Sequence, residues 1–363
     1  MARIFQDGFE MGRPGFNRVS RNGTYDDSLW ILHASSTLTN TEFGARSGYG
    51  SSGNYGFYIH CSQGSSFWIE RTFNEGLMEH FGRAEFARHA YGGDSPNIIG
   101  MFDDNGGIVA SIRADDQGDL AYYIGNTEVG RTSNITIVDV FARIEWRLRI
   151  GTENGVFEVK INGNSLFSWQ GDTQGENLGE ITKLRIGCWP DKIRGTWDDI
   201  AINDTTGTVN NSWVGKGSIL LLKPKGAGNY SQFTPNEAGN NWEKVNEVPN
   251  DGDTTYVESE NAEEIDTYEM EELIADHAID PDSIVKAVQV CFTGRYEGTD
   301  AHLAPMLRSG VTDEEGDKKT LASSYHRLFQ QVFNVNPSTT EQWTHEEVDA
   351  LEAGVKHKEH AYD

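Results

Sequence analysis

A strict alternation of apolar and charged residues over residues 141–169 constrains this chain more than any other feature. In FARIEWRLRI every second residue from Ala142 to Ile150 is apolar, and the residues between them are Arg or Glu. The run GVFEVKI repeats this period of two, which is typical of strands packed on one face. Asn154-Gly155 and Asn162-Gly163 follow the runs, and Asn-Gly is a strong hairpin signal. We expect three antiparallel strands here, covered by a second sheet because no amphipathic helix lies nearby.

Short strand-like runs separated by turn residues fill most of the remaining sequence. The chain contains 40 glycines and few helical patterns. Many short strands at even spacing predict a sandwich or barrel. Beyond residue 205 we expect strands at 218–223, 284–293, 303–308 and 325–335, then a short helix or turn within 344–355 leading into a last strand.

The length of 363 residues favours two domains over one. A segment rich in Gly, Asn and Thr, TTGTVNNSWVGKG at 205–217, marks the expected boundary. We therefore predict an all-β chain of two β-sandwich (jelly-roll) domains in tandem, over 1–213 and 214–363.

The net charge of −26 argues against binding nucleic acid or an anionic membrane surface. No apolar run approaches the roughly 20 residues of a membrane span, and no signal peptide opens the chain. The three cysteines, Cys61, Cys188 and Cys291, are widely spaced and odd in number, so they are interpreted as buried thiols that suit a reducing cytoplasm.

The first 205 residues or so resemble the concanavalin A-like lectin/glucanase sandwiches, which include laminin-G-like domains. The resemblance rests on the opening ARIFQDGFE, the hairpin RIEWRLRI…GVFEVKINGN and the closing WDDIAIND. It implies a β-sandwich. It implies little about function, because many unrelated activities use this fold.

The arrangement also resembles virion proteins of tailed bacteriophages. The second half contributes SILLLKPKGAGNYSQFTPN and the ending FNVNPSTTEQWTHEEVDALEAGVK to this resemblance. It implies a non-enzymatic structural protein of the tail, fibre or baseplate, or one that decorates the capsid, assembled in the host cytoplasm. Its expected partners are copies of itself, other virion proteins and host-surface polysaccharide.

Two other functions stay open, a glycan-binding lectin-like module and a glycoside hydrolase similar to family 16. Glu264, Asp266 and Glu269 match the ExDxxE signature of that hydrolase family, which would make them nucleophile, tuning residue and acid/base. The run 258–272 is acidic throughout, however, so the match also arises from a solvated acidic edge. We predict that the chain is not an enzyme.

Three further groups of residues are candidates for binding. Aromatic side chains near a Gly-rich loop could form a glycan platform, although aromatics in sandwiches are more often core; they are Tyr49, Tyr55, Trp68 and Tyr91. Asp103, Asp104 and Asn105 offer oxygen ligands for calcium, but Asp-Asn-Gly-Gly is also an ordinary turn. No cofactor is expected beyond a possible calcium ion. Gly48–Gly53 formally match GxGxxG, but a strand-like run follows where a nucleotide site needs a helix.

Overall fold

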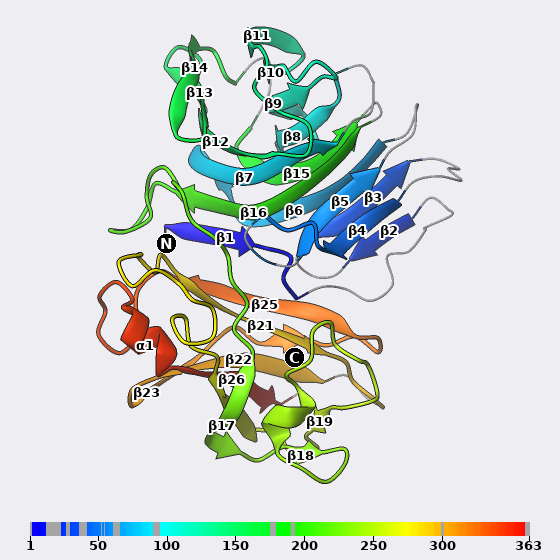
Figure 1. The fold of residues 1–363 in the computed structure, drawn as a ribbon, viewed down its shortest axis with the longest axis vertical. Helices are drawn as coiled ribbons and strands as arrows, with labels where there is room; N and C mark the ends of the chain where they lie inside the picture. The colour runs from blue at the N-terminus through cyan, green and yellow to red at the C-terminus, as the bar shows by residue number, and fades with distance from the viewer. Residues whose placement is uncertain are drawn as a thin grey trace. The chain divides into compact units, whose positions relative to one another are not determined.

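A computed structural model describes residues 2–11, 23–26, 30–35, 42–51, 53, 55–60, 66–89, 95–174, 179–189, 193–298 and 301–359. The chain divides into two compact units, the first ending at Leu220 and the second beginning at Leu221. In both, nearly all of the regular secondary structure consists of antiparallel strands (Figure 1). The predicted all-β class is therefore confirmed. The sequence had suggested a boundary at residue 213.

The first unit contains two eight-stranded sheets. Sheet A has the order β14-β13-β12-β7-β16-β5-β4, with β1 on β16. Its strands are β1 (Arg3–Asp7), β4 (Glu42–Ser47), β5 (Tyr55–His60), β7 (Glu79–His89), β12 (Phe141–Arg149), β13 (Gly155–Ile161), β14 (Asn164–Gly171) and β16 (Arg194–Asp204). Sheet B has the order β11-β10-β9-β8-β15-β6-β3-β2. Its strands are β2 (Gly23–Asp26), β3 (Ile31–Ser35), β6 (Ser66–Leu77), β8 (Asn97–Phe102), β9 (Ile108–Ala114), β10 (Leu120–Ile124), β11 (Thr127–Thr132) and β15 (Ile181–Trp189).

The three strands expected over residues 141–169 form as predicted. β12 pairs with β13, placing Trp146 opposite Val159, and β13 pairs with β14. Asn162 and Gly163 both have positive φ, 51° and 86°. A two-residue hairpin whose twist matches the strands requires this conformation, and Asn-Gly adopts it at little cost. The sequence therefore specifies this hairpin locally.

The core of the first unit lies between the two sheets. Ile144, Trp146 and Phe86 project into it from sheet A and are fully buried, as are Ile99 and Ile186 of sheet B. The apolar half of the alternating run thus faces sheet B, as expected for a sandwich. Rings from the two sheets also meet, since Tyr122 of β10 stacks on Phe167 of β14 with centroids 4.3 Å apart.

The second unit has a sheet of order β17-β20-β26-β22-β23, with β24 on β22, and two separate strand pairs, β18-β19 and β21-β25. Its elements are β17 (Pro224–Ser231), β18 (Thr234–Pro235), the 3-10 helix η1 (Asn241–Lys244), β19 (Val257–Glu258), β20 (Ile265–Met270), β21 (Val288–Gly294), β22 (His302–Ser309), β23 (Thr312–Glu315), β24 (Lys319–Thr320), β25 (His326–Phe333), α1 (His345–Asp349) and β26 (Glu352–Lys358). The predicted short helix before a last strand is confirmed. Thr344 begins it, its hydroxyl accepting from the Glu347 amide.

Two expectations from the sequence are wrong. Residues 218–223, all of them described, form no strand; β17 begins at Pro224. The amide of Ile219 instead donates to the Asp199 carboxylate at 2.7 Å. The backbone of this apolar run is therefore hydrogen-bonded to a side chain and not to a neighbouring strand. Cys188 is a disulfide-bonded residue and not a thiol. The argument for a reducing compartment therefore fails, because disulfides persist in oxidising ones.

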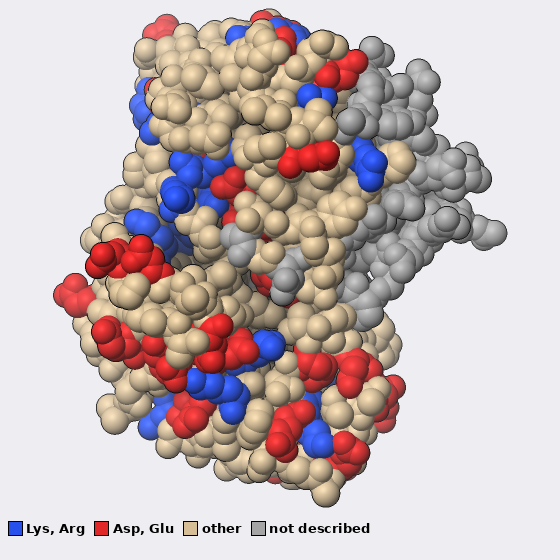
Figure 2. All heavy atoms as spheres, in the orientation of Figure 1, with Lys and Arg blue, Asp and Glu red and all other residues tan. Residues whose placement is uncertain are grey.

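The second unit carries most of the negative charge. In Figure 2 acidic side chains are spread over its surface and basic ones are fewer. The basic residues are shared among carboxylates: Lys356 and Lys358 each pair with both Glu263 and Glu315. In the described part of the chain no helix is long and apolar enough to cross a membrane.

A substitution at Gly82 of β7 tests the packing of the core of the first unit. A Cβ built on Gly82 would lie 2.0 Å from the ring of Trp146, which is fully buried. We expect Gly82→Ala to destabilise the chain by about 1–3 kcal/mol in a denaturant titration, as overpacking does. Gly179→Ala is the control, since its Cβ meets nothing closer than 3.9 Å. Equal midpoints for the two variants would contradict this packing.

Candidate functional site

The candidate site lies on the face of sheet A that points away from sheet B, here called the outer face. In β7 the even-numbered residues face the core, so the odd-numbered ones, ending at His89, point to the outer face. The register places Arg194 of β16 opposite His89, and Thr196 between Ala87 and Tyr58 of β5. Three adjacent strands therefore bring His89, Thr196, Arg194 and Tyr58 together.

One part of the outer face is covered by residues 213–219 of the same unit. The Gly215 amide donates to Glu145 at 2.7 Å, and Arg83 donates to the Gly217 carbonyl. Trp213 packs on Phe81, with ring centroids 5.6 Å apart. Glu145, only 2% exposed, was expected from the alternation to face solvent. On the charged face of the alternating run, Glu145 is thus satisfied by the unit's own backbone, whereas Arg147 pairs with the side chains of Glu79 and Glu158.

A buried carboxylate connects this covered part to the loop between β4 and β5. Asp198 accepts hydrogen bonds from the amides of Ser51, at 2.6 Å, and Asp199, at 2.7 Å. Its burial and the neighbouring Asp199 carboxylate raise the pKa of Asp198 to about 8. Asp198 therefore holds the Gly-rich loop and with it Tyr49, two residues before Ser51. The loop connects two paired antiparallel strands, not a strand and a helix as GxGxxG requires.

Beyond the covered part, a group of polar and aromatic side chains lies together, of which Tyr49, His89 and Arg194 are partly exposed and Tyr58 and Thr196 are buried. We call Tyr49, Tyr58, His89, Arg194 and Thr196 the Tyr–His–Arg cluster. The ring centroids of Tyr49 and Tyr58 are 5.0 Å apart, and His89 lies 6.0 and 5.8 Å from them. Arg194 Nε donates to Tyr58 Oη at 2.6 Å. That hydrogen bond raises the pKa of Arg194, so the guanidinium stays charged.

The imidazole of His89 is held from both sides. Nδ1 lies 2.6 Å from Oδ1 of Asp139, and Nε2 lies 2.8 Å from Oγ1 of Thr196. A carboxylate only accepts, so Nδ1 carries the proton and, in the neutral ring, Nε2 accepts from the Thr196 hydroxyl. The His89 side chain is 14% exposed and that of Asp139 70%. The ring is thus fixed in orientation yet reachable from solvent.

The cluster combines three chemistries that suit a sugar. Tyr rings present flat apolar faces and hydroxyls, which match the faces and hydroxyl edges of a pyranose. A guanidinium pairs with carboxylates in a fixed bidentate geometry. A histidine held between a carboxylate and a hydroxyl presents an imidazole of fixed orientation. The described residues contain no group of three or more His, Cys, Asp or Glu side chains placed to hold a metal ion.

The four aromatics predicted as a glycan platform do not form one site. Tyr49 belongs to the cluster. Tyr55 begins β5 three residues from Tyr58, on the opposite face of the strand. Trp68 belongs to β6 of sheet B, where it packs on Trp189 with centroids 6.0 Å apart and Arg185 lies over its ring. Tyr91 lies outside the described residues.

The ExDxxE residues lie on β20 and its leading end. β20 pairs with β26 without a register shift, so side chains alternate strictly and the odd spacing puts Glu264 and Glu269 on opposite faces. Glu264 accepts from Ser259 and Asn261. Asp266 is fully buried. Its carboxylate accepts from the backbone amides of Gln232 and Phe233 and from the side chains of Asn241 and Tyr268. Retention needs both glutamates across one sugar, and the strand does not provide this.

The calcium candidates form a turn between β8 and β9. The Asp103 carboxylate accepts from the Gly107 amide at 2.6 Å, and the Asp103 amide donates back to the Gly107 carbonyl at 3.0 Å. Asp103 is 1% exposed, whereas Asp104 and Asn105 are exposed. One oxygen of Asp103 thus stabilises the turn, and calcium binding here stays a prediction.

Most of the cluster was missed from the sequence. Tyr58, His89 and Arg194 belong to three strands that are neighbours in sheet A but distant in the chain. No short motif joins them. The available signal was indirect. β7 and β16 are central strands of sheet A, and polar residues in central strands need hydrogen-bond partners on the outer face.

No known family's sequence profile matches this chain, and no curated protein matches it. Among solved structures, the cellulose-induced protein Cip1 is 16% identical with a TM-score of 0.44, covering 59% of this chain and 100% of its own. An endo-β-1,4-glucuronan lyase from the fungus Trichoderma reesei is 14% identical with a TM-score of 0.37, covering 48% of this chain and 90% of its own. A sialidase is 9% identical with a TM-score of 0.41, covering 56% of this chain and 18% of its own.

At these identities and TM-scores, function has to be argued from the site itself. The comparisons nevertheless correct one prediction. The chain was predicted not to be an enzyme, yet the similar structures include a glucuronan lyase and sialidases. A firm exclusion of catalysis is therefore wrong. None of the similar structures named here is described as a bacteriophage protein.

Asp198 should make stability depend on pH. Its folded pKa, about 8, lies above the ordinary 3.8, so the unfolded chain releases this proton first as pH rises. The free energy of unfolding should therefore fall between about pH 4 and pH 8, by on the order of 2 kcal/mol or more from this group. Asp198→Asn should flatten the slope measured by denaturant titration at several pH values. A slope unchanged by the substitution would contradict the assignment.

Proposed function

We propose that the first unit binds a carbohydrate chain at the Tyr–His–Arg cluster and prefers sugars that carry a carboxylate. The observation that carries this proposal is that Tyr49, His89 and Arg194 are partly exposed around the buried Tyr58, to which the charged guanidinium of Arg194 is hydrogen-bonded. Stacking on aromatic rings accounts for sugar affinity, and the guanidinium accounts for the preference for an acidic sugar.

The charges around the cluster support this choice of ligand. The chain as a whole is strongly acidic, so it repels anionic ligands at long range. Binding of a uronate therefore requires a local cation, and Arg194 supplies it. The arginines of the covered part are already engaged, as Arg83 is with Glu85, Asp199 and the Gly217 carbonyl. Arg194 is thus the guanidinium placed to meet a ligand here.

Binding can be measured by calorimetry with an oligoglucuronate and a cello-oligosaccharide of equal length. We expect the oligoglucuronate to bind more tightly, and Tyr49→Ala and Arg194→Gln each to weaken it by about tenfold. The control is Arg131→Gln, which removes an exposed arginine of β11 paired with Asp115 and Glu128. Loss on Trp68→Ala with none on Tyr49→Ala would move the site to sheet B and contradict the proposal.

A second candidate function is cleavage of the bound glycan, favoured by the fixed His89. An imidazole oriented by Asp139 and next to the rings of Tyr49 and Tyr58 can take or give a proton at a sugar ring. In this role His89 would be catalytic, Asp139 would position it, and Arg194 would hold the sugar carboxylate.

Cleavage is tested by incubating the chain with polyglucuronate and measuring new chain ends. We expect ends to appear, His89→Ala to remove this activity, and Asp139→Asn to lower it about tenfold or more without changing binding. If the wild type and the variants bind the glycan but produce no new chain ends, cleavage is contradicted and only the binding function remains.

A position on a bacteriophage particle, which the sequence resemblance implied, stays a proposal. Sugar binding is compatible with recognition of a host surface, and self-assembly with repeated symmetric use. Mass spectrometry and immunogold labelling of purified particles test it directly, and absence of the chain from the particles would end it.

A further inference from the structure

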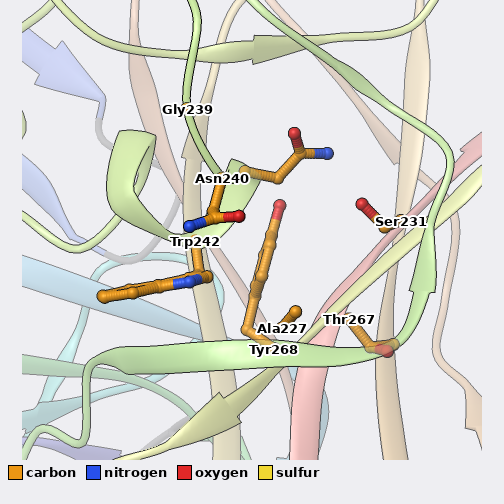
Figure 3. A pocket seen from close by; sticks show the side chains of 8 residues that line it. Ala227, Ser231, Gly239, Asn240, Trp242, Thr267 and Tyr268 are labelled. Atoms are coloured by element: carbon orange, nitrogen blue, oxygen red, sulfur yellow. The ribbon is translucent and has the colours of Figure 1, made fainter.

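The second unit contains a pocket that the first unit's function does not use. It is a cavity of about 130 Å³ lined by Ala227, Ser231, Gly239, Asn240, Asn241, Trp242, Thr267 and Tyr268 (Figure 3). Its walls come from β17, β20 and η1. These described lining residues supply two aromatic rings, two side-chain amides and three hydroxyls, counting the Tyr268 phenol, and none of them is charged.

The polar groups of the pocket are held by a buried carboxylate behind them. Asp266 Oδ2 accepts from Tyr268 Oη at 3.0 Å and from Asn241 Nδ2 at 2.6 Å. Asn241 Nδ2 also donates to the Phe233 carbonyl at 2.8 Å, so both of its hydrogens are used. The amide and the phenol are thereby fixed with their donors turned to the protein. Their remaining capacity is that of acceptors, which calls for a ligand rich in donors.

The wall formed by η1 is preformed. The backbone amide of Asn240 donates to the Glu243 carboxylate at 3.0 Å, and Lys244 Nζ pairs with Glu237 at 2.7 Å. On the opposite side, the Thr267 hydroxyl donates to the buried Glu352 at 2.6 Å. Trp242 is half-buried, so one part of its ring stays accessible. Figure 3 shows the Trp242 and Tyr268 rings on one side and Ser231 on the other.

We propose that this pocket binds one neutral sugar residue, independently of the cluster in the first unit. Sugar hydroxyls supply the donors that the fixed acceptors need, and the Trp242 ring supplies an apolar face for stacking. The volume is well below the roughly 300 Å³ at which pockets for larger ligands begin, so it takes one ring rather than a chain. The acidic surroundings disfavour a uronate, and the nearby ammonium of Lys244 is already paired with Glu237.

The test uses the full chain and saturation-transfer NMR with methyl glucoside, galactoside and mannoside, and with methyl glucuronide as the charged probe. We expect at least one neutral glycoside to bind and the glucuronide not to. Trp242→Ala should weaken binding about tenfold, and Ala227→Phe, which fills the pocket from an exposed position, should abolish it. Tyr230→Phe is the control, because Tyr230 shares β17 but its hydroxyl donates to Asp313 outside the pocket.

The outcomes separate this site from that of the first unit. Arg194→Gln should leave neutral glycoside binding unchanged. If Trp242→Ala fails to fold, Ala227→Phe still decides the question. No binding of any neutral glycoside, binding unaffected by filling the pocket, or equal binding of the glucuronide would overturn the proposal.

Discussion

The first unit depends on how the charged residues of sheet A are satisfied on the face opposite the core. Central strands of a sandwich normally turn polar side chains to water, but here Arg83, Glu145 and Asp199 are at most 3% exposed. Burying such groups is costly unless each is paired and hydrogen-bonded. The backbone of residues 215–219 supplies the partners, donating amides to Glu145 and Asp199 and accepting from Arg83. This segment is therefore part of the fold of the first unit and not a loose connection.

The same constraint determines where a ligand can bind. The covered part of the outer face has no room for one, because its charges are used internally. The cluster lies beyond it, and Asp198 links the two by holding the loop that carries Tyr49. Arg194 and Tyr58 fix each other, and Asp139 and Thr196 fix His89. The site is thus preorganised by contacts within one sheet and its loop.

Local patterns predicted the fold far better than the site. The period of two from Ala142 to Ile150 and the Asn162-Gly163 turn were sufficient for the central hairpins, because pleating and turn geometry are local properties. The prediction of a strand at 218–223 was wrong, because the backbone there hydrogen-bonds to the Asp199 side chain and not to another strand. Strict alternation could have shown that Glu264 and Glu269 cannot share a face. Tyr58, His89 and Arg194 could not be grouped, because only sheet order makes them neighbours.

The two proposed sites differ in their surroundings. The first presents a guanidinium beside aromatic rings, and the second an uncharged pocket whose amide and phenol are oriented by Asp266. Burial raises the pKa of Asp266, whereas its four hydrogen bonds favour the ionised form.

Hydrogen–deuterium exchange of the full chain, with and without an oligoglucuronate, tests the central claim most directly. If the Tyr–His–Arg cluster binds the sugar, exchange should slow in peptides covering residues 48–51, 55–60 and 193–197. It should stay the same in 213–219, which covers another part of the outer face and is already hydrogen-bonded to Glu145 and Asp199. Slower exchange confined to 66–70 and 185–189, around Trp68 and Arg185, or no change anywhere, would contradict the account.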